Sequence, residues 1–308
     1  MKSVRRFIVF LAIAFFSLIS VSAAQAGPSV NMLVTVEARH GSTPPDIARE
    51  DVMVYQGHDR DAVTGWQHAD ANHLPLQLFV LLDDAANISL GSQLEDLSQF
   101  IRAQSPSTLV GIAYMLDGNA QVLQNPTTDH ALAAKALHLP LGNPGVNASP
   151  YFSLSDLIKR WPATDSARRE VLMITDGIDR YWGGGTDDPY VDDAIADAQK
   201  AGILVYTIYT PGVGHDMHSG FRVFWGQNYL SEIADETGGE SYYIGFNGPA
   251  VSFSPFLESL SNSFTRQYLL TFTAKPEKKA GRQRVRLQTE VPNAELRGAS
   301  QVFVPAAP

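Results

Sequence analysis

The sequence predicts a doubly wound, Rossmann-like α/β domain with a mostly parallel sheet, together with a small β-rich domain formed by the N- and C-terminal segments. Three observations support this prediction. Continuous apolar runs of strand length recur in the middle of the chain, as in strands buried on both faces. Amphipathic helical patterns separate these runs, and strands that alternate with helices form parallel sheets. Period-two patterns of shorter strands precede residue 72 and return after residue 267.

The first 26 residues have the three parts of a secretory signal peptide. Three basic side chains come first, an apolar run covers residues 7–21, and the small residues Ala24 and Ala26 precede the cleavage position. The alternative is a retained membrane anchor, but the run is short for a bilayer span of about 20 residues. We therefore expect a periplasmic or secreted protein that does not insert into the membrane after signal cleavage.

Composition narrows the classes of partner and compartment. The signal peptide holds three basic residues and no acid, so its removal takes the formal net charge from −9 to −12. Such an acidic surface repels nucleic acid and anionic membranes, so we expect no nucleic-acid partner. The chain has no cysteine, which excludes a disulfide framework and a lipid anchor on cysteine.

The two ends of the chain are predicted to form one small domain. The N-terminal segment, residues 27–74, has strand patterns at 30–36, 52–55 and 62–66. The C-terminal segment, residues 267–308, has strand patterns at 268–273, 285–290 and 302–304, and its basic stretch at 278–286 is interpreted as a hairpin. Because a lone hairpin is marginal in water, we expect the two segments to pack together.

The central segment, residues 75–266, is predicted to alternate strands with helices. Strands are predicted at 78–82, 109–115, 171–175, 203–209 and 242–244, with a short edge strand at 121–123. Helical apolar stripes lie at 90–101, 131–139, 154–161, 191–198, 230–234 and 256–264. Ser92 with Glu95 fits a capping box, and Asp188 precedes a helix that has Pro189 at its first position.

Two of the predicted inner strands run into acidic residues, Asp83 and Asp176. In open doubly wound sheets, ligands bind beyond the carboxyl ends of the strands, where the strand order reverses. If the two strands are neighbours, these carboxylates face one another, and with nearby hydroxyl or amide oxygens they suit a hard divalent cation such as Mg²⁺. The alternative is that both acids cap the turns or helices that follow.

Short motifs around these acids resemble those of von Willebrand factor A (VWA) domains. The stretch from Asp83 to Asn87 resembles the family's first motif, Asp-x-Ser-x-Ser, and Thr175-Asp176-Gly177 is similar to its later Thr-Asp-Gly motif. Ser149, just ahead of a helix, is the best match to the family's Thr. The strand order agrees over roughly residues 75–265. The flanks, from Val34 through Tyr55 and in the closing strand Tyr268-Leu269-Leu270, resemble a group of VWA-related secreted proteins that is common in acidobacteria.

The resemblance implies a sheet of the VWA type and a metal-ion-dependent adhesion site for Mg²⁺, whose coordination a partner's carboxylate often completes. The resemblance implies that Asp83 and Asp176 either bind the metal directly or accept hydrogen bonds from the groups that do. It implies that Ser149 is the hydroxyl ligand. The sequence departs from the motif at Ala85 and Asn87, where the family has serine. Alanine offers no oxygen, and asparagine offers a carbonyl on a longer arm. The site is therefore expected to be degenerate, with Mg²⁺ bound weakly or not at all.

Six aromatic residues gather around the loop after the strand at 203–209. They are Tyr206, Tyr209, Phe221, Phe224, Trp225 and Tyr229. Core packing accounts for those that are buried, whereas an exposed cluster would mark a binding surface.

The leading functional hypothesis is an exported protein-binding module, of the adhesion or scaffold kind, and not an enzyme. Its partner would be another protein. One alternative is a metal-assisted hydrolase built on Asp83, Asp176 and Asp179. The other is a structural subunit of an envelope complex that docks through its β-rich domain. No base–nucleophile pair of a known catalytic motif occurs in the sequence, which argues against the hydrolase.

Overall fold

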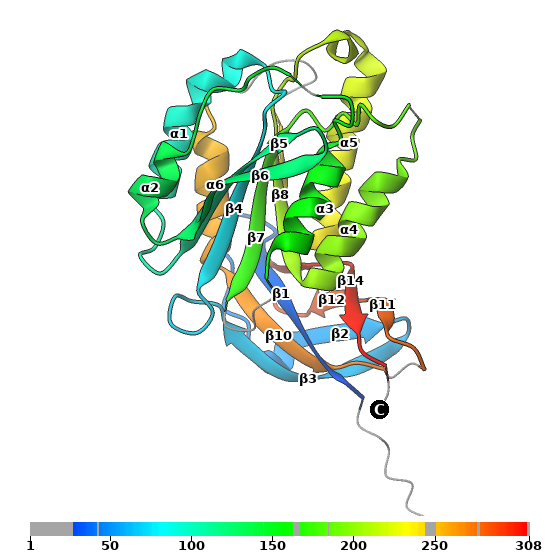
Figure 1. The fold of residues 1–308 in the computed structure, drawn as a ribbon. Coiled ribbons are helices and arrows are strands. Elements are labelled where there is room, and N and C mark those ends of the chain that lie inside the picture. The colour runs from blue at the N-terminus through cyan, green and yellow to red at the C-terminus, as the bar shows by residue number, and fades with distance from the viewer. Residues whose placement is uncertain are drawn as a thin grey trace, which may run out of the picture.

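The α/β part and the β-rich part of the chain lie end to end in the computed structural model (Figure 1). The structure describes residues 27–41, 43–143, 145–162, 167–183, 185–243, 251–275 and 278–306. The predicted signal peptide, residues 1–26, lies outside the described residues. Among the residues that are described, no helix is long and apolar enough to span a membrane.

A six-stranded sheet forms the centre of the α/β part, in the order β6-β5-β4-β7-β8-β9. The strands are β4 (Leu76–Asp83), β5 (Leu109–Leu116), β6 (Asn119–Thr127), β7 (Arg168–Thr175), β8 (Ile203–Tyr209) and β9 (Ser241–Tyr242). Neighbouring strands are parallel except for β5 and β6, which are antiparallel. The predicted mostly parallel sheet is confirmed. The edge strand β6 is longer than expected, because its pairing with β5 continues through two register shifts.

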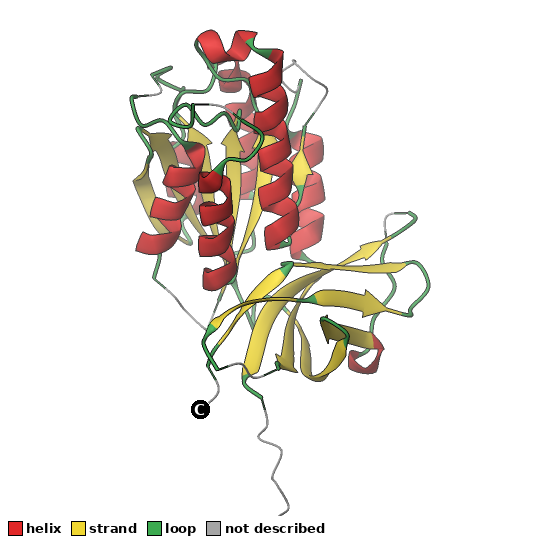
Figure 2. Ribbon diagram, turned by 90° about the vertical axis from the view of Figure 1, so that its right-hand side faces the viewer, coloured by secondary structure: helices red, strands yellow, loops and turns green. Residues whose placement is uncertain are grey.

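Helices cover both faces of this sheet (Figure 2). One face carries α1 (Leu94–Arg102), α2 (His130–Lys135) and α6 (Ser254–Phe264), and the other carries α3 (Pro150–Arg160), α4 (Pro189–Ala201) and α5 (Gly220–Thr237). Successive residues of β4 point to opposite faces. Leu78, Val80 and Leu82 pack in the first core, and Phe79 and Leu81 pack in the second. Two-sided burial explains why β4 is a continuous apolar run.

The helix after β4 begins later than the capping-box pattern predicts. Residues Ile88–Gln93 form a 3-10 helix, η2, whose N-cap is Asn87, and α1 starts at Leu94. The Ser92 hydroxyl donates to the carbonyl of Ser89 over 2.8 Å. The predicted capping box is therefore wrong, because a short 3-10 segment takes up the first turn.

The β-rich part combines strands from both ends of the chain. Its six-stranded sheet has the order β12-β2-β3-β10-β1-β13. The strands are β1 (Ser29–Ala38), β2 (Val52–Gln56), β3 (Asp59–His68), β10 (Gln267–Thr273), β12 (Arg286–Thr289) and β13 (Ala294–Gly298). A separate pair joins β11 (Gly281–Arg284) to β14 (Gln301–Val304). The predicted β-rich region from the two termini is therefore present, whereas the predicted domain boundaries stay a prediction.

The basic stretch at 278–286 is not a hairpin, so that prediction is wrong. Strands β11 and β12 are adjacent in sequence, but β11 pairs with β14 and β12 pairs with β2. Val285, which lies between them, is buried in the apolar core of the β-rich part. The chain crosses from one sheet to the other at this residue, and that crossing leaves no pairing between the two strands.

A buried polar cluster joins the two parts of the molecule at the amino end of β7. Arg168 Nε lies 3.2 Å from Glu170 Oε1, and Arg168 Nη2 donates to the carbonyl of Phe264 over 3.1 Å. Gln267, the first residue of β10, donates to Glu170 Oε2 and to the Tyr206 hydroxyl, each over 3.0 Å. Burial raises the pKa of Glu170, and Arg168 partly offsets this rise. The β-rich part therefore lies at the amino ends of the parallel strands, which leaves their carboxyl ends open at the opposite pole (Figure 1).

Candidate functional site

The two predicted acids lie on neighbouring strand ends. Asp83 is the last residue of β4, and Asp176 directly follows β7. The parallel register places Leu82 beside Ile174, so both acids reach the same edge of the sheet. The Thr175 hydroxyl donates to Asp83 Oδ2 over 2.6 Å. The structure thus brings the two acids together, whereas their role as metal ligands stays a prediction.

Each acid also stabilises the turn that follows it. Asp83 Oδ1 accepts a hydrogen bond from the backbone N–H of Ala85 over 2.8 Å. Asp176 Oδ1 accepts one from the backbone N–H of Ile178 over 2.8 Å. These are the local turn contacts expected of aspartate. Both acids therefore cap the turns that follow them, as the alternative interpretation expects, and they also lie close together.

Arg180 lies against this acid pair and is not among the predicted site residues. Its Nη2 donates to Asp176 Oδ2 over 2.5 Å, and its Nη1 donates to Asp176 Oδ1 over 3.3 Å. The remaining contacts of the guanidinium are with the carbonyls of Ile178 and Val213 and with Asp216, whose Oδ2 lies 3.8 Å from Arg180 Nε. A bidentate arginine–carboxylate pair of this kind is strong and directional. The only hint in the sequence is the i, i+4 spacing of Asp176 and Arg180. This spacing alone does not predict a contact, because the residues between them form a turn and not a helix.

The charges of this group are strongly coupled because they are buried. Burial and the neighbouring Asp176 together raise the pKa of Asp83 to about 6, while Arg180 acts in the opposite sense. Burial alone would lower the pKa of Arg180, but Asp176 and Asp83 hold it above its ordinary value. One cation therefore serves two carboxyl groups in a region of low dielectric constant.

Two loops close over the acid pair. Ala86 forms an isolated antiparallel bridge with Gly212, and the N–H of Asn87 donates to the carbonyl of Pro211 over 2.7 Å. The N–H of Val213 donates to the carbonyl of Ala85 over 3.0 Å. Asp176 is fully buried beneath this closure. A ligand from solvent therefore has no direct path to its carboxylate.

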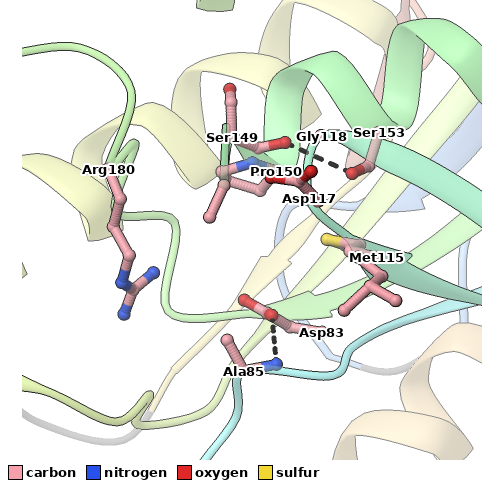
Figure 3. Close-up of a pocket in the computed structure, with 11 residues that line it drawn as sticks. Asp83, Ala85, Met115, Asp117, Gly118, Ser149, Pro150, Ser153 and Arg180 are labelled. Carbon is pink, nitrogen blue, oxygen red and sulfur yellow. Dashed lines mark hydrogen bonds between the residues drawn. The ribbon is translucent and has the colours of Figure 1, made fainter. Parts of the chain in front are cut away.

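Ser149 reaches the same crevice from the start of α3. It is the N-cap of that helix, where its hydroxyl oxygen accepts from the N–H of Phe152 over 3.3 Å. The hydroxyl donates to Asp179 Oδ2 over 2.6 Å. Ser149, Asp83 and Arg180 line one small cleft (Figure 3). Its open volume is about 10 Å³, roughly the space of one water molecule.

The side chain of Asn87, the fourth predicted site residue, is committed elsewhere. Its Oδ1 accepts from the backbone N–H of Ser89 over 3.0 Å and so caps η2. Ala85 lines the cleft but carries no side-chain oxygen. Among the described residues, no group of three or more histidine, cysteine, aspartate or glutamate side chains is arranged to hold a metal ion. The residues present therefore do not fit an octahedral Mg²⁺ site. Arg180 occupies both oxygens of Asp176. Of the two serine oxygens in the family's first motif, one is missing at Ala85 and the other is replaced by an Asn87 oxygen that points to the η2 backbone.

Large apolar side chains are exposed around this edge of the sheet. Of twelve such side chains among the described residues, nine lie in segments that follow the carboxyl ends of the parallel strands or lead into helices at that pole. We call these nine the apolar rim: Ile88, Leu139, Leu141, Val146, Tyr181, Phe221, Phe224, Tyr243 and Val251. Val251 is 94% exposed, Val146 is 88% exposed and Phe221 is 75% exposed. Apolar surface gathered in this way is typical of interaction sites.

The aromatic group after β8 divides between core and surface. Tyr206, Tyr209 and Tyr229 are buried, as expected for core packing. Phe221 and Phe224, on the first turns of α5, are exposed and belong to the apolar rim. The sequence pattern therefore located part of the exposed surface, but it did not indicate the other loops that contribute to it.

No protein-family model matches this sequence, and no curated protein matches it. Solved structures with a similar fold include a von Willebrand factor type A protein from Catenulispora acidiphila, with 11% identity and a TM-score of 0.45, covering 92% of this chain and 75% of that one. The conserved hypothetical protein BatB from Bacteroides thetaiotaomicron has 13% identity and a TM-score of 0.42, covering 62% of this chain and 97% of that one. The manganese-loaded TRAP protein of Plasmodium vivax has 12% identity and a TM-score of 0.41, covering 84% of this chain and 100% of that one. These likenesses concern the fold alone.

Proposed function

We propose that the mature protein is an exported protein-binding module, of the adhesion or scaffold kind, that recognises its partner through the apolar rim. The degenerate adhesion site at Asp83, Asn87, Ser149 and Asp176 lies inside this rim. Its location would be the periplasm or the exterior of the cell, as the signal peptide pattern indicates. The partner is another protein and not a nucleic acid, because the mature chain is strongly acidic.

The position of the apolar rim is the observation that carries this proposal. Exposing side chains such as Phe221 and Val146 to water is unfavourable, by about 25 cal/mol per Å² of apolar surface. A partner that covers them recovers this free energy, and aromatic residues are enriched in the cores of protein interfaces. The segments that carry the rim lie at the carboxyl ends of the parallel strands. This is the pole away from the β-rich part (Figure 1), so binding there leaves the β-rich part free.

The geometry favours neither of the two other candidate functions. A metal-assisted hydrolase on Asp83, Asp176 and Asp179 would need substrate to reach the acids, but Asp176 is fully buried and bound to Arg180. A structural subunit that docks through its β-rich domain would expose apolar side chains there. Phe303, on β14, is the one large apolar side chain of the described β-rich strands that is exposed, and only to 36%.

Site-specific photo-cross-linking in cells tests the proposal. A photoreactive phenylalanine analogue replaces Phe221 or Val146 in the rim, and Phe303 or Leu123 at matched exposed positions outside it. We expect the same partner to be captured from both rim positions and from neither control. Capture from Phe303 alone would support the structural subunit instead, and equal capture from all four positions would contradict a specific rim.

A further inference from the structure

We infer that the guanidinium of Arg180 is the resident cation of this site and occupies the role that a divalent metal ion has in the resembled adhesion sites. The site is then permanently charged, and partner binding at the rim does not respond to Mg²⁺. Only the statement about partner binding rests on the proposed function. The assignment of the cation itself concerns Asp83, Asp176 and Arg180 alone.

The guanidinium of Arg180 lies directly against the Asp176 carboxylate. Arg180 Nη2 lies 2.5 Å from Asp176 Oδ2, and Arg180 Nη1 lies 3.3 Å from Asp176 Oδ1. A Mg²⁺ ion on either oxygen would need a distance of about 2.1 Å. It would then share the space of the guanidinium and repel its charge. Metal and Arg180 therefore exclude one another at this carboxylate.

Oxygen ligands for a metal ion are scarce at this site. Asp83 Oδ2 accepts from Thr175, Asn87 Oδ1 caps η2, and Ala85 has no oxygen. Mg²⁺ loses its waters reluctantly and commonly keeps several of them. The cleft beside Asp83 has an open volume of about 10 Å³, which accommodates roughly one water. A hydrated ion has no room there, whereas the guanidinium brings its own hydrogen-bond donors.

The surrounding backbone is shaped to hold the guanidinium. A Cβ on Gly212 would lie 1.9 Å from Asp176 Oδ2 and 2.8 Å from Arg180 Nη2, so only glycine fits above the pair. The carbonyl of Val213 accepts from Arg180 Nη2 over 3.3 Å, and Asp216 approaches Arg180 from the same loop. All these contacts come from the segment after β8, far from Arg180 in sequence. Together with Asp176 and the carbonyl of Ile178, they leave neither of the guanidinium's outer nitrogens without an acceptor.

The test compares the purified mature protein with Arg180→Ala, using Mn²⁺ as the probe and thermal melting with electron paramagnetic resonance as readouts. For the unaltered protein we expect no change in Tm on adding Mn²⁺ or a chelator, and no bound-ion signal. Arg180→Ala leaves two buried carboxyl groups without a cation, which is strongly destabilising. We expect a lower Tm that Mn²⁺ raises again, and a bound-ion signal at Mn²⁺ concentrations about tenfold or more below those at which the unaltered protein still shows none. Ethylguanidinium should raise the Tm of this variant too, because it restores the missing group.

Two further variants keep the test decisive. Arg222→Ala removes a neighbouring arginine whose guanidinium pairs with Asp216 at 2.8 Å, and it should gain no Mn²⁺ binding. Arg180→Lys retains a cation and should also gain none. If Arg180→Ala is unfolded, Mn²⁺ should restore its folded circular dichroism spectrum.

The inference is overturned if the unaltered protein binds Mn²⁺, if Mn²⁺ fails to stabilise or refold Arg180→Ala, or if Arg180→Lys binds Mn²⁺ as well as Arg180→Ala does. None of these measurements involves the partner. A failure of the cross-linking experiment at the rim is therefore distinguishable from a failure of the cation assignment.

Discussion

Asp188 caps helix α4 while it interacts with another buried acid. Its Oδ1 accepts from the N–H of Tyr190 over 2.9 Å. Burial, with a smaller contribution from the nearby carboxylates of Asp179 and Asp192, raises the pKa of Asp188 to about 6. The folded protein therefore holds this proton more tightly than the unfolded chain does, so stability is lost as the pH rises from about 4 to 6 and stays lost above that range.

Asp188→Asn should stabilise the protein at neutral pH, because asparagine is an equally good N-cap but carries no charge. We expect a gain of about 1 kcal/mol in the free energy of unfolding near pH 8, and no gain near pH 4. Urea unfolding at the two pH values measures it. Asp129→Asn, at the exposed N-cap of α2, is the matched control and should change little at either pH. An equal gain at both values would show that charge is not the cause.

Gly212→Ala tests the close approach of the loop after β8 to the buried ion pair. The added Cβ would overlap Asp176 Oδ2, so the pair or the loop has to move. We expect a loss of roughly 1–3 kcal/mol in the free energy of unfolding, as for other overpacked sites. Gly220→Ala has open space around its Cβ and should be neutral or slightly stabilising. Equal stability of the two variants would contradict the described closure over Asp176.

The sequence predicts the position of a site residue at the end of a buried strand, but not that of a residue placed by a loop. Asp83 and Asp176 were located from the sequence because each follows a buried strand, and neighbouring parallel strands end at one edge. Arg180 was missed because its contacts depend on a turn that folds back and on a loop more than thirty residues later. Asn87 was considered as a ligand, but the 3-10 helix that takes up its side chain left no clear pattern in the sequence.

Strand β4 is buried on both faces of the sheet, so its core positions should not tolerate a charged side chain. Leu81 is fully buried between the sheet and helices α3 to α5. Leu81→Asp places a carboxylate there without a partner, at a cost of several kcal/mol, against a total stability of roughly 5–15 kcal/mol. We expect no folded protein by circular dichroism. Leu123→Asp, on the half-exposed edge strand β6, should fold with a nearly unchanged melting temperature. A native melting curve for Leu81→Asp would contradict burial on both faces.

Elements with a strong period were predicted well, and elements set by distant pairing were not. The inner strands are continuous apolar runs, and Asp188, Pro189 and Gly202 mark the ends of α4 as expected. Strand β13 was not predicted, because it is only five residues long and owes its place to pairing with β1. The hairpin predicted at 278–286 is absent for the same reason, since β11 and β12 are adjacent in sequence but pair with the distant strands β14 and β2.

The two ends of the chain depend on one another in the whole molecule. Strand β1 pairs with β10 on one side and with β13 on the other, and both of these strands come from the C-terminal segment. Deleting residues 268–308 should therefore abolish the hydrogen-exchange protection of β1 (Ser29–Ala38), since unpaired strands are marginal in water. Protection of β4 in the α/β part is the internal control and should persist. Unchanged protection of β1 would contradict the interdependence of the two ends.

At the scale of the molecule, the sequence indicated the order of the parts but not their orientation. The return of strand patterns after residue 267 pointed to pairing between the ends. It did not show that the β-rich part lies at the amino ends of the parallel strands, because the buried polar contacts of Arg168 and Gln267 decide that placement. Most of the apolar rim was also hidden, since its nine side chains come from loops and from the first turns of η2 and α5, spread over the whole α/β part.

The central claim is that the rim binds a protein partner without a metal ion. The most direct test is the affinity of the cross-linked partner, once purified, for the mature protein, measured with excess Mg²⁺ and with a chelator. We predict less than a roughly twofold difference between the two conditions, and a loss of about tenfold or more, near 1.4 kcal/mol, for the double variant Val146→Ser with Phe221→Ser. Binding that the chelator abolishes, or that the double variant leaves unchanged, would contradict the account.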